Sequence, residues 1–292
     1  MRVKRPLIIG ADGGIGKELT AALRVKGCNP LATTRRSSAS SSGGPEVLYL
    51  DLADMASWTP PETADVAFLC AAITATDQCR KDPAGTRRVN VENTVLLADR
   101  LVRSGWFVFF LSTNLVFDGS TPLCAASAPV NPRTEYGRQK AEAEARLQAL
   151  GSSVAILRLS KVLTPDFSLF SRWAGELSKG RPVAPFHDMT IAPVPMGLLI
   201  QVLLDLAESP MGGIWQLSAM DEISYAQAAL QLCRSAGYDE TLVRPVSWRE
   251  ACPDLEHVPA HTTLDCSRLA QAFGFTPLSA QDALMRTLGD FQ

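Results

Sequence analysis

The sequence predicts an α/β protein, in which a doubly wound parallel sheet covered by helices precedes a smaller carboxyl-terminal lobe. Short apolar segments alternate with longer amphipathic segments through the first half of the chain, which is typical of βαβ units. A glycine-rich turn directly follows the first apolar segment. After about Leu159 the alternation is replaced by a stretch rich in glycine, proline and aromatic residues between Thr164 and Pro195. These three observations set the fold class.

The individual elements of the first domain follow from their periodicity. Leu7–Ile9 is the first predicted strand, and Ile15–Val25 is a helix that ends before Gly27, a residue suited to the left-handed cap position. Val47–Leu50 and Val66–Cys70 are apolar throughout, as expected of parallel strands buried on both faces. The remaining predicted elements are Leu31–Thr33, Val91–Val102, Val108–Leu111, Thr134–Leu150 and Val154–Leu157.

We therefore expect residues 1–160 to form the sheet domain and residues 161–292 a smaller α/β substrate-binding lobe, from which the chain can cross back to the first domain. The predicted elements of this lobe are Met196–Ala207, Gly213–Leu217, Tyr225–Ala236, Ser267–Phe273 and Ala280–Leu288.

Composition points to a small-molecule partner. The 292 residues include 28 basic and 30 acidic side chains, so the formal charge of −2 gives no general attraction to nucleic acid or to an anionic membrane. The apolar runs are shorter than the roughly 20 residues that span a bilayer. Seven cysteines without a CxxC pair favour a reduced, cytoplasmic protein. We expect no metal site, because Pro259 interrupts the helical spacing of His257 and His261.

The turn after the first strand has the spacing of a dinucleotide site. It reads Gly10-Ala-Asp-Gly13-Gly14-Ile15-Gly16 and opens a helix, whose free N–H groups and dipole favour a pyrophosphate. Glycine allows the backbone to approach that group closely. Gly10, Gly13, Gly14 and Ile15 are the expected cofactor contacts.

The end of the second strand favours NADP(H) over NAD(H). An acidic residue that would bind a ribose 2′-hydroxyl is missing there, and Arg35 and Arg36 suit a 2′-phosphate, although solvated loop arginines are the alternative. Asp51 and the adjacent Leu52 follow the third strand, where they are expected to meet the adenine. A turn or helix cap explains Asp51 equally well.

A second motif indicates proton transfer. Tyr136 and Lys140 are four residues apart on one helical face, and an ammonium group beside a phenol is expected to lower the pKa of the phenol. Ser112 and Thr113 end a strand, where open α/β sheets place their ligands, so the Thr113 hydroxyl completes a candidate catalytic set.

Together, the glycine turn, the Ser112-Thr113 strand end and the YxxxK helix resemble the extended short-chain dehydrogenase/reductase superfamily with its Rossmann fold. Ser-Thr-Asn-Leu-Val-Phe-Asp-Gly119, Tyr136-Gly-Arg-Gln-Lys140 and Leu264-Asp-Cys-Ser-Arg-Leu269 are most similar to its dTDP-4-dehydrorhamnose reductase branch. The resemblance implies NADPH-dependent reduction of the keto group of a nucleotide-linked sugar, with Tyr136 as proton donor, Lys140 as its tuning and ribose-binding partner, and Thr113 polarising the ketone.

The same resemblance implies further roles. Ala71, Ala72, Thr74 and Asn90 are placed near the cofactor, with a helix cap as the alternative for Asn90. Arg158 is a structural or a site arginine. Two further residue pairs have two interpretations each: His187-Asp188 lines the substrate cleft or lies on the surface, and Arg172-Trp173 stacks on a base or packs in the core.

Two departures concern the substrate. This chain has Asn114-Leu115 where the branch usually has Asp-Tyr, and Lys161 near the position where the branch usually has a tryptophan. Both differences fall where the sugar is expected to bind, so the resemblance does not identify the sugar. Asn114-Leu115 also lacks the acid and base that dehydration needs. A sugar nucleotide epimerase and a non-catalytic regulatory subunit, such as the methionine adenosyltransferase β subunit, remain the alternatives. The helices Val91–Val102 and Thr134–Leu150 could pair in a homodimer.

Overall fold

The structure is a computed structural model that describes residues 5–36, 47–55, 58–61, 64–164 and 167–288. The chain forms two compact units. The first contains Met1–Val116, Val130–Arg158 and Ile200–Trp215, and the second contains Phe117–Pro129, Leu159–Leu199 and Gln216–Gln292. The chain thus passes more than once between the two units.

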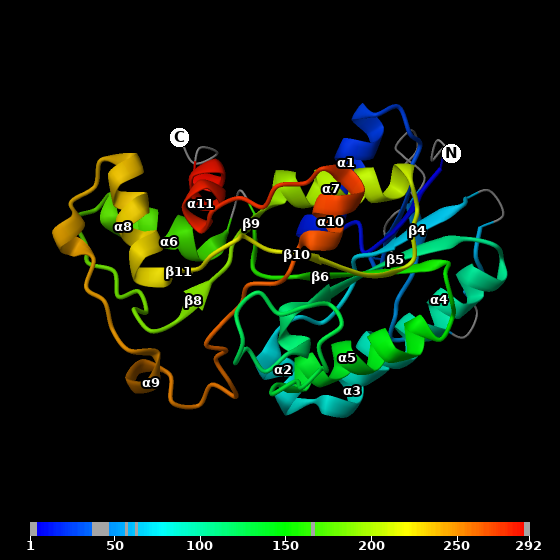
Figure 1. Cartoon of the computed structure of the whole chain (residues 1–292), viewed down its shortest axis with the longest axis horizontal. Coiled ribbons are helices and arrows are strands. Elements are labelled where there is room, and N and C mark those ends of the chain that lie inside the picture. The colour runs from blue at the N-terminus through cyan, green and yellow to red at the C-terminus, as the bar shows by residue number, and fades with distance from the viewer. Residues whose placement is uncertain (1–4, 37–46, 56–57, 62–63, 165–166, 289–292) are drawn as a thin grey trace. The chain divides into compact units, whose positions relative to one another are not determined.

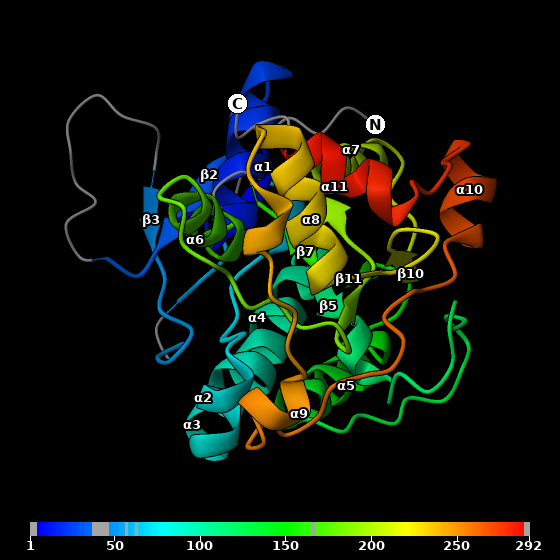
Figure 2. The same cartoon turned by 90° about the vertical axis from the view of Figure 1, so that its left-hand side faces the viewer.

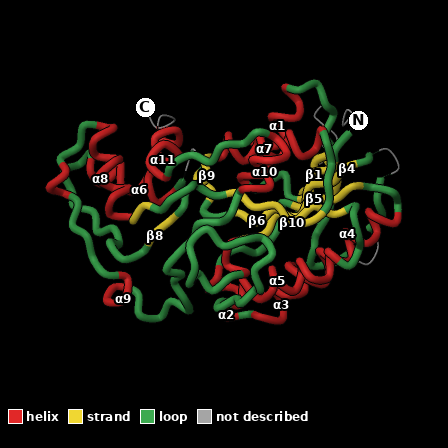
Figure 3. Tube along the Cα trace, in the orientation of Figure 1, coloured by secondary structure: helices red, strands yellow, loops and turns green. Residues whose placement is uncertain are grey.

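A seven-stranded sheet forms the centre of the first unit (Figure 3). Its order is β10-β6-β5-β4-β1-β2-β3, and the pairs from β5 through β4, β1 and β2 to β3 are parallel. The chain leaves β1 toward β2 and β3, then returns to its other side with β4, so β1 and β4 flank the point where the strand order reverses. Ligands of open α/β sheets bind at the carboxyl ends of the strands at such a point. The strands are β1 (Leu7–Ile9), β2 (Leu31–Thr34), β3 (Val47–Tyr49), β4 (Val66–Leu69), β5 (Phe107–Thr113), β6 (Val154–Leu159) and β10 (Gly213–Leu217).

Helices cover both faces of this sheet (Figure 1). α1 (Gly14–Val25) lies on one face, and α4 (Thr94–Arg103) and α5 (Glu135–Gln148) lie on the other. Leu97 and Leu101 of α4 and Leu147 of α5 are fully buried against strand residues such as Val108 and Ile156. This apolar contact fixes α5, which carries Tyr136 and Lys140, on β5.

The structure corrects the predicted elements in two places. The single helix predicted over Val91–Val102 is preceded by α2 (Thr76–Lys81), α3 (Pro83–Arg87) and a π-helical segment, η1 (Arg88–Asn93). A cap explains α3: the Asp82 carboxylate accepts a hydrogen bond from the Gly85 N–H at 2.9 Å, which starts the helix. The strand assigned to the second lobe is instead β10, beside β6, because strand periodicity does not reveal the pairing partner.

The second unit has its own core. In it α6 (Ser168–Leu177) packs against α8 (Tyr225–Ala236), seen side by side in Figure 2, with Phe170, Trp173 and Leu232 buried between them. No helix among the described residues is long and apolar enough to cross a bilayer. The further elements of the chain are η2 (Asn114–Val116), β7 (Val162–Leu163), β8 (Thr190–Ile191), β9 (Val194–Pro195), α7 (Met196–Glu208), β11 (Ile223–Ser224), η3 (Glu240–Leu242), α9 (Trp248–Ala251), α10 (Ser267–Phe273) and α11 (Ala280–Leu288).

Candidate active site

The glycine turn joins β1 to α1 at the carboxyl edge of the sheet. Gly10 has a φ of +85°, and a Cβ placed there would lie 2.7 Å from the Cβ of Ala71. At Gly16 a Cβ would lie 2.2 Å from the Gly10 carbonyl oxygen. Glycine is therefore required at both positions, one for its left-handed backbone and one for the close approach of α1.

The start of α1 suits a phosphate group. Gly13 is the N-cap residue and supplies no side-chain hydrogen bond to the first turn, and the helix continues for twelve residues from Gly14. The first N–H groups of such a helix attract anions. The turn with Gly10, Gly13, Gly14 and Ile15 thus fits the pyrophosphate of a dinucleotide, and contact with a cofactor stays a prediction.

The loop after β4 lies beside this turn. Ala71 faces Gly10, and Ala72 and Thr74 follow it in the chain. Asn90 holds the loop: its Oδ1 accepts from the Ile73 N–H at 2.8 Å, and its Nδ2 donates to the Ile73 carbonyl at 2.9 Å. Asn90 is 1% exposed and lies inside η1, so the helix-cap interpretation is wrong and its amide instead shapes the loop predicted to border the cofactor.

Asp51 and Leu52 follow β3. The Asp51 Oδ1 accepts a hydrogen bond from the Ala53 N–H at 2.8 Å, so the carboxylate caps its own turn. The Leu52 side chain is 8% exposed, and its carbonyl accepts from the Asn93 Nδ2 at 2.7 Å. The turn-cap interpretation of Asp51 is confirmed, and a contact of either residue with adenine stays a prediction.

The Thr113, Tyr136 and Lys140 side chains come from β5 and α5, which pack together. The Lys140 Nζ donates to the Leu111 carbonyl at 2.8 Å and lies 4.2 Å from the ring centroid of Phe110, so α5 is bonded to the end of β5. Gly137 allows a second close approach, because a Cβ there would lie 2.2 Å from the Leu115 carbonyl oxygen. The turn after Thr113 therefore packs directly against the start of the tyrosine helix.

Two hydroxyl groups lie at the end of β5. Thr113 is 8% exposed, and its Oγ1 accepts from the Leu115 N–H at 3.2 Å. The Ser112 Oγ is buried and has no hydrogen-bond partner within the described chain. Because an unpaired buried hydroxyl is costly, this orphaned group fits a site completed by a bound molecule.

Burial changes the protonation chemistry that the YxxxK spacing predicts. The pKa of Tyr136 is raised by burial, and the Lys140 Nζ lies 6.0 Å from the phenol ring centroid, with its hydrogen bond directed to β5. The expectation that Lys140 lowers the tyrosine pKa is wrong for this structure, because desolvation of the phenolate dominates. The raised pKa keeps Tyr136 a neutral phenol, which is the form that can donate a proton.

Lys140 is itself perturbed. Burial lowers its pKa to about 8, and the negative charge of Glu144 opposes that shift. Glu144 in turn forms an ion pair with Arg158 at 2.7 Å, and both side chains are 2% exposed. Arg158 is therefore a structural arginine. Glu144 was not predicted, although it lies four residues beyond Lys140 and so continues the Tyr136–Lys140 face of the helix.

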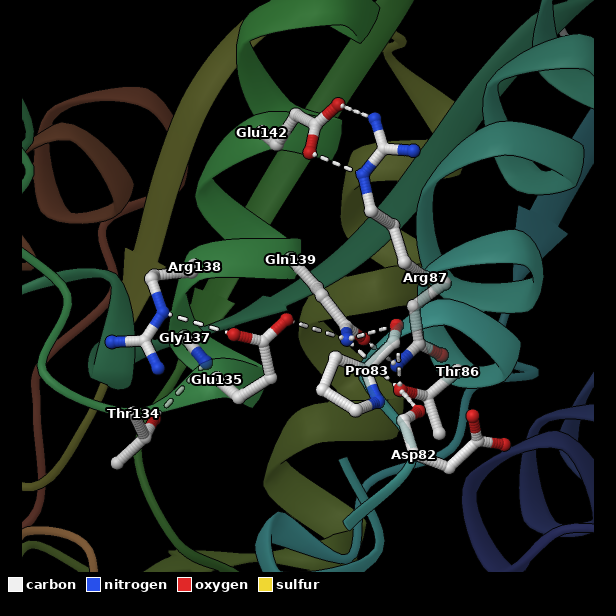
Figure 4. Close-up of polar contacts among 11 residues, drawn as sticks. Asp82, Pro83, Thr86, Arg87, Thr134, Glu135, Gly137, Arg138, Gln139 and Glu142 are labelled. Carbon is white, nitrogen blue, oxygen red and sulfur yellow. Dashed lines mark hydrogen bonds and ion pairs between the residues drawn. The ribbon is translucent and has the colours of Figure 1, made fainter. Parts of the chain in front are cut away.

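A second unpredicted residue, Gln139, organises the other side of α5 (Figure 4). Its Nε2 donates to the Thr86 Oγ1 at 2.9 Å and to the Glu135 Oε1 at 3.0 Å, and its Oε1 accepts from the Asn90 Nδ2 at 2.9 Å. Nearby, the Arg87 Nε donates to the Glu142 Oε2 at 3.0 Å. Gln139, at 1% exposure, thus links α5 to Asn90, the residue that holds the Ile73 loop.

The remaining predicted residues lie in the second unit. Asp188 accepts from the Ser247 Oγ at 2.6 Å and from the Trp248 N–H at 2.8 Å, a structural role, while Lys161 lies 5.1 Å from the Phe167 ring centroid. His257 bonds to the Asp118 carbonyl and His261 to Glu222. The described residues contain no group of three potential metal ligands.

The second unit also contains a pocket of about 210 Å³. Trp173, 5% exposed, packs on Phe170 and Tyr225, as the core interpretation predicts, and at the same time lines this pocket. The lining residues are Leu169, Arg172, Trp173, Ala184, Pro185, Phe186, Met189 and Tyr225.

Comparison with known proteins agrees with the geometry. The family model of the RmlD substrate binding domain matches residues 4–292. A dTDP-4-dehydrorhamnose reductase from Aggregatibacter actinomycetemcomitans is 26% identical over 96% of this chain and 97% of its own. The dTDP-4-dehydrorhamnose reductase from Bacillus anthracis, solved in complex with NADP, superposes with a TM-score of 0.85 at 18% identity, over 99% of this chain and 100% of its own. MoeE5 in complex with UDP-glucose and NAD has a TM-score of 0.79 at 19% identity, with 98% of each chain covered.

Proposed function

The chain belongs to the RmlD substrate binding domain family of sugar nucleotide reductases, and on this premise we propose that it reduces the keto group of a nucleotide-linked sugar with NADPH. The membership confirms the resemblance to NAD(P)-dependent extended short-chain reductases and the α/β fold with its Rossmann-like sheet. The observation that carries the finer proposal is the close packing of α5, which bears Tyr136 and Lys140, on the end of β5 that bears Thr113.

Each residue has a chemical task in this proposal. Tyr136 donates its phenolic proton to the keto oxygen as the carbonyl is reduced to an alcohol, and the Thr113 hydroxyl polarises the same oxygen. Protonated Lys140 supplies positive charge beside the tyrosine as that proton leaves. The bound cofactor supplies the hydride. The turn from Gly10 to Ile15, the Ala71–Thr74 loop, Asn90, Asp51 and Leu52 are the groups proposed to hold that cofactor, with Arg35 and Arg36 at its 2′-phosphate.

The second unit supports a nucleotide-linked substrate. Its pocket combines three aromatic side chains, Trp173, Phe186 and Tyr225, with the Arg172 guanidinium. Flat aromatic faces and a guanidinium plane suit a heterocyclic base. We propose that this pocket binds the base of the substrate.

We also propose that the chain forms a homodimer through α4 and α5. Light scattering of the purified protein would test this oligomeric state.

The test is turnover by matched variants. Nucleotide-linked 4-keto sugars are mixed with NADPH and its oxidation is followed at 340 nm. Tyr136→Phe is expected to lower kcat by about 10²- to 10⁴-fold, because the general acid is removed, while NADPH binding is preserved. Tyr238→Phe, in the second unit, is the control.

Three results would contradict the proposal. Full activity of Tyr136→Phe would exclude the tyrosine as proton donor. Cofactor that co-purifies tightly and does not exchange, with interconversion of sugar epimers, would identify an epimerase. Cofactor binding without turnover, with a stoichiometric enzyme partner recovered in a pull-down, would identify a regulatory subunit.

A further inference from the structure

The glycine turn is bonded to the end of β2. The Gly10 N–H donates to the Thr33 Oγ1 at 3.0 Å, and the Ala11 N–H donates to the Thr33 carbonyl at 3.2 Å. One residue further, the Thr34 hydroxyl donates to the Asp12 carboxylate. These bonds hold the carboxylate of a glycine-turn residue at the carboxyl end of β2.

Asp12 also lies beside the arginine proposed for the 2′-phosphate. The Arg36 Nε is 4.0 Å from the Asp12 Oδ2, and the Arg36 N–H donates to the Thr34 Oγ1 at 3.1 Å. The Asp12 and Arg36 side chains are 41% and 79% exposed. The Thr34 hydroxyl thus binds both the Asp12 carboxylate and the Arg36 backbone N–H, and the two charged side chains remain accessible to a ligand.

We propose that Asp12 determines cofactor specificity by weakening the preference of this site for NADPH over NADH. Dinucleotide sites that favour NAD present an acidic side chain near the end of the second strand, where it accepts a hydrogen bond from the ribose 2′-hydroxyl. In this chain the acidic side chain reaches the same strand end from the glycine turn. The inference rests on the cofactor site of the proposed function.

The physical reason is charge. A carboxylate beside Arg36 neutralises part of the field that would attract a 2′-phosphate, and it repels the phosphate directly. The same carboxylate can accept a hydrogen bond from a 2′-hydroxyl, so it opposes NADPH without opposing NADH. Because the groups are exposed, the effect is moderate and salt-dependent.

The test measures cofactor binding and needs no substrate. Wild type, Asp12→Asn and the control Asp99→Asn are titrated with NADPH and NADH by fluorescence at low and high salt. Asparagine keeps an oxygen that can accept from Thr34 and removes the charge, and Asp99 is a carboxylate on α4 that pairs with Arg103. The ratio of the NADH Kd to the NADPH Kd is expected to rise about 3- to 10-fold in Asp12→Asn at low salt, and less at high salt.

Two results would overturn the proposal while leaving the proposed function intact. One is a ratio of the NADH Kd to the NADPH Kd that is the same in Asp12→Asn as in wild type. The other is an equal decrease in both Kd values, which would show that Asp12 acts on the pyrophosphate that both cofactors share. Failure of the wild type to bind either cofactor would instead overturn the proposed function. The melting temperature of each variant confirms that it is folded.

Discussion

The two ends of the proposed cofactor site differ in burial. At α5 and the neighbouring β6, Lys140, Glu144 and Arg158 are at most 3% exposed, and each charge has a defined partner. At the end of β2, Asp12 and Arg36 are 41% and 79% exposed and lie 4.0 Å apart. Water and salt screen the second pair and not the first. Charge at α5 is therefore expected to act on stability and on the proposed catalysis together, whereas charge at β2 is expected to act on cofactor choice.

The largest effect is expected from the buried ion pair. Glu144→Gln removes the carboxylate that pairs with the buried Arg158 guanidinium, and removal of one partner of such a pair costs about 3–5 kcal/mol. Urea unfolding followed by circular dichroism measures the change. Glu142→Gln, a half-exposed position two residues earlier in α5, is the control, and its loss of unfolding free energy should be far smaller.

Lys140 connects this burial to pH. Its pKa is lowered to about 8, so the ammonium group loses its proton as pH rises through that value, and the proposed reduction is expected to slow over the same range. The unfolded chain binds more protons at this group between about pH 8 and its usual value, so the group's contribution to stability rises with pH across that window. Below about pH 8 the folded chain buries Lys140 in its charged form, so the full cost of desolvating the ammonium group lowers the stability.

The direction of this pH dependence can be measured. Between about pH 7.5 and 9, the free energy of unfolding of wild type relative to Lys140→Met should increase by about 1 kcal/mol. Cys70 has the opposite sign, because burial raises its pKa to about 12, and comparison of two chains that both contain Cys70 removes most of its contribution. A pH-independent difference would show that Lys140 is not desolvated.

Substitution of Gln139 tests whether neutral buried polar groups at α5 also stabilise the fold (Figure 4). Gln139→Met preserves the side-chain length and leaves the Thr86 and Asn90 groups without their shared partner, at an expected cost of about 1–3 kcal/mol. Hydrogen exchange should also become faster at the Ile73 amide, since Asn90 loses the bond that orients it. Gln148→Met, at the exposed end of α5, is the control, and equal exchange in both variants would show that Gln139 does not support the loop.

The sequence predicted what is local and missed what is distant. The glycine turn and the YxxxK motif each span only a few residues, so both can be recognised in a single sequence. Gln139 and Glu144 take their roles from Asn90 and Arg158, which reach them only through the fold. The direction of the tyrosine pKa shift was predicted wrongly, because the four-residue spacing of Tyr136 and Lys140 shows the lysine charge but not the desolvation around the phenol.

The smallest effect on stability is expected at β2. Arg36→Ala removes an exposed guanidinium that lies 4.0 Å from the Asp12 carboxylate, so the melting temperature should shift by less than about 1–2 °C. NADPH binding should nevertheless weaken several-fold relative to NADH, since a cation opposite the 2′-phosphate is lost. In the double variant with Asp12→Asn, the gain from removing the carboxylate should be smaller than in wild type, because part of that gain acts through Arg36. Strictly additive effects would show that the carboxylate repels the phosphate directly and that the two exposed side chains act independently.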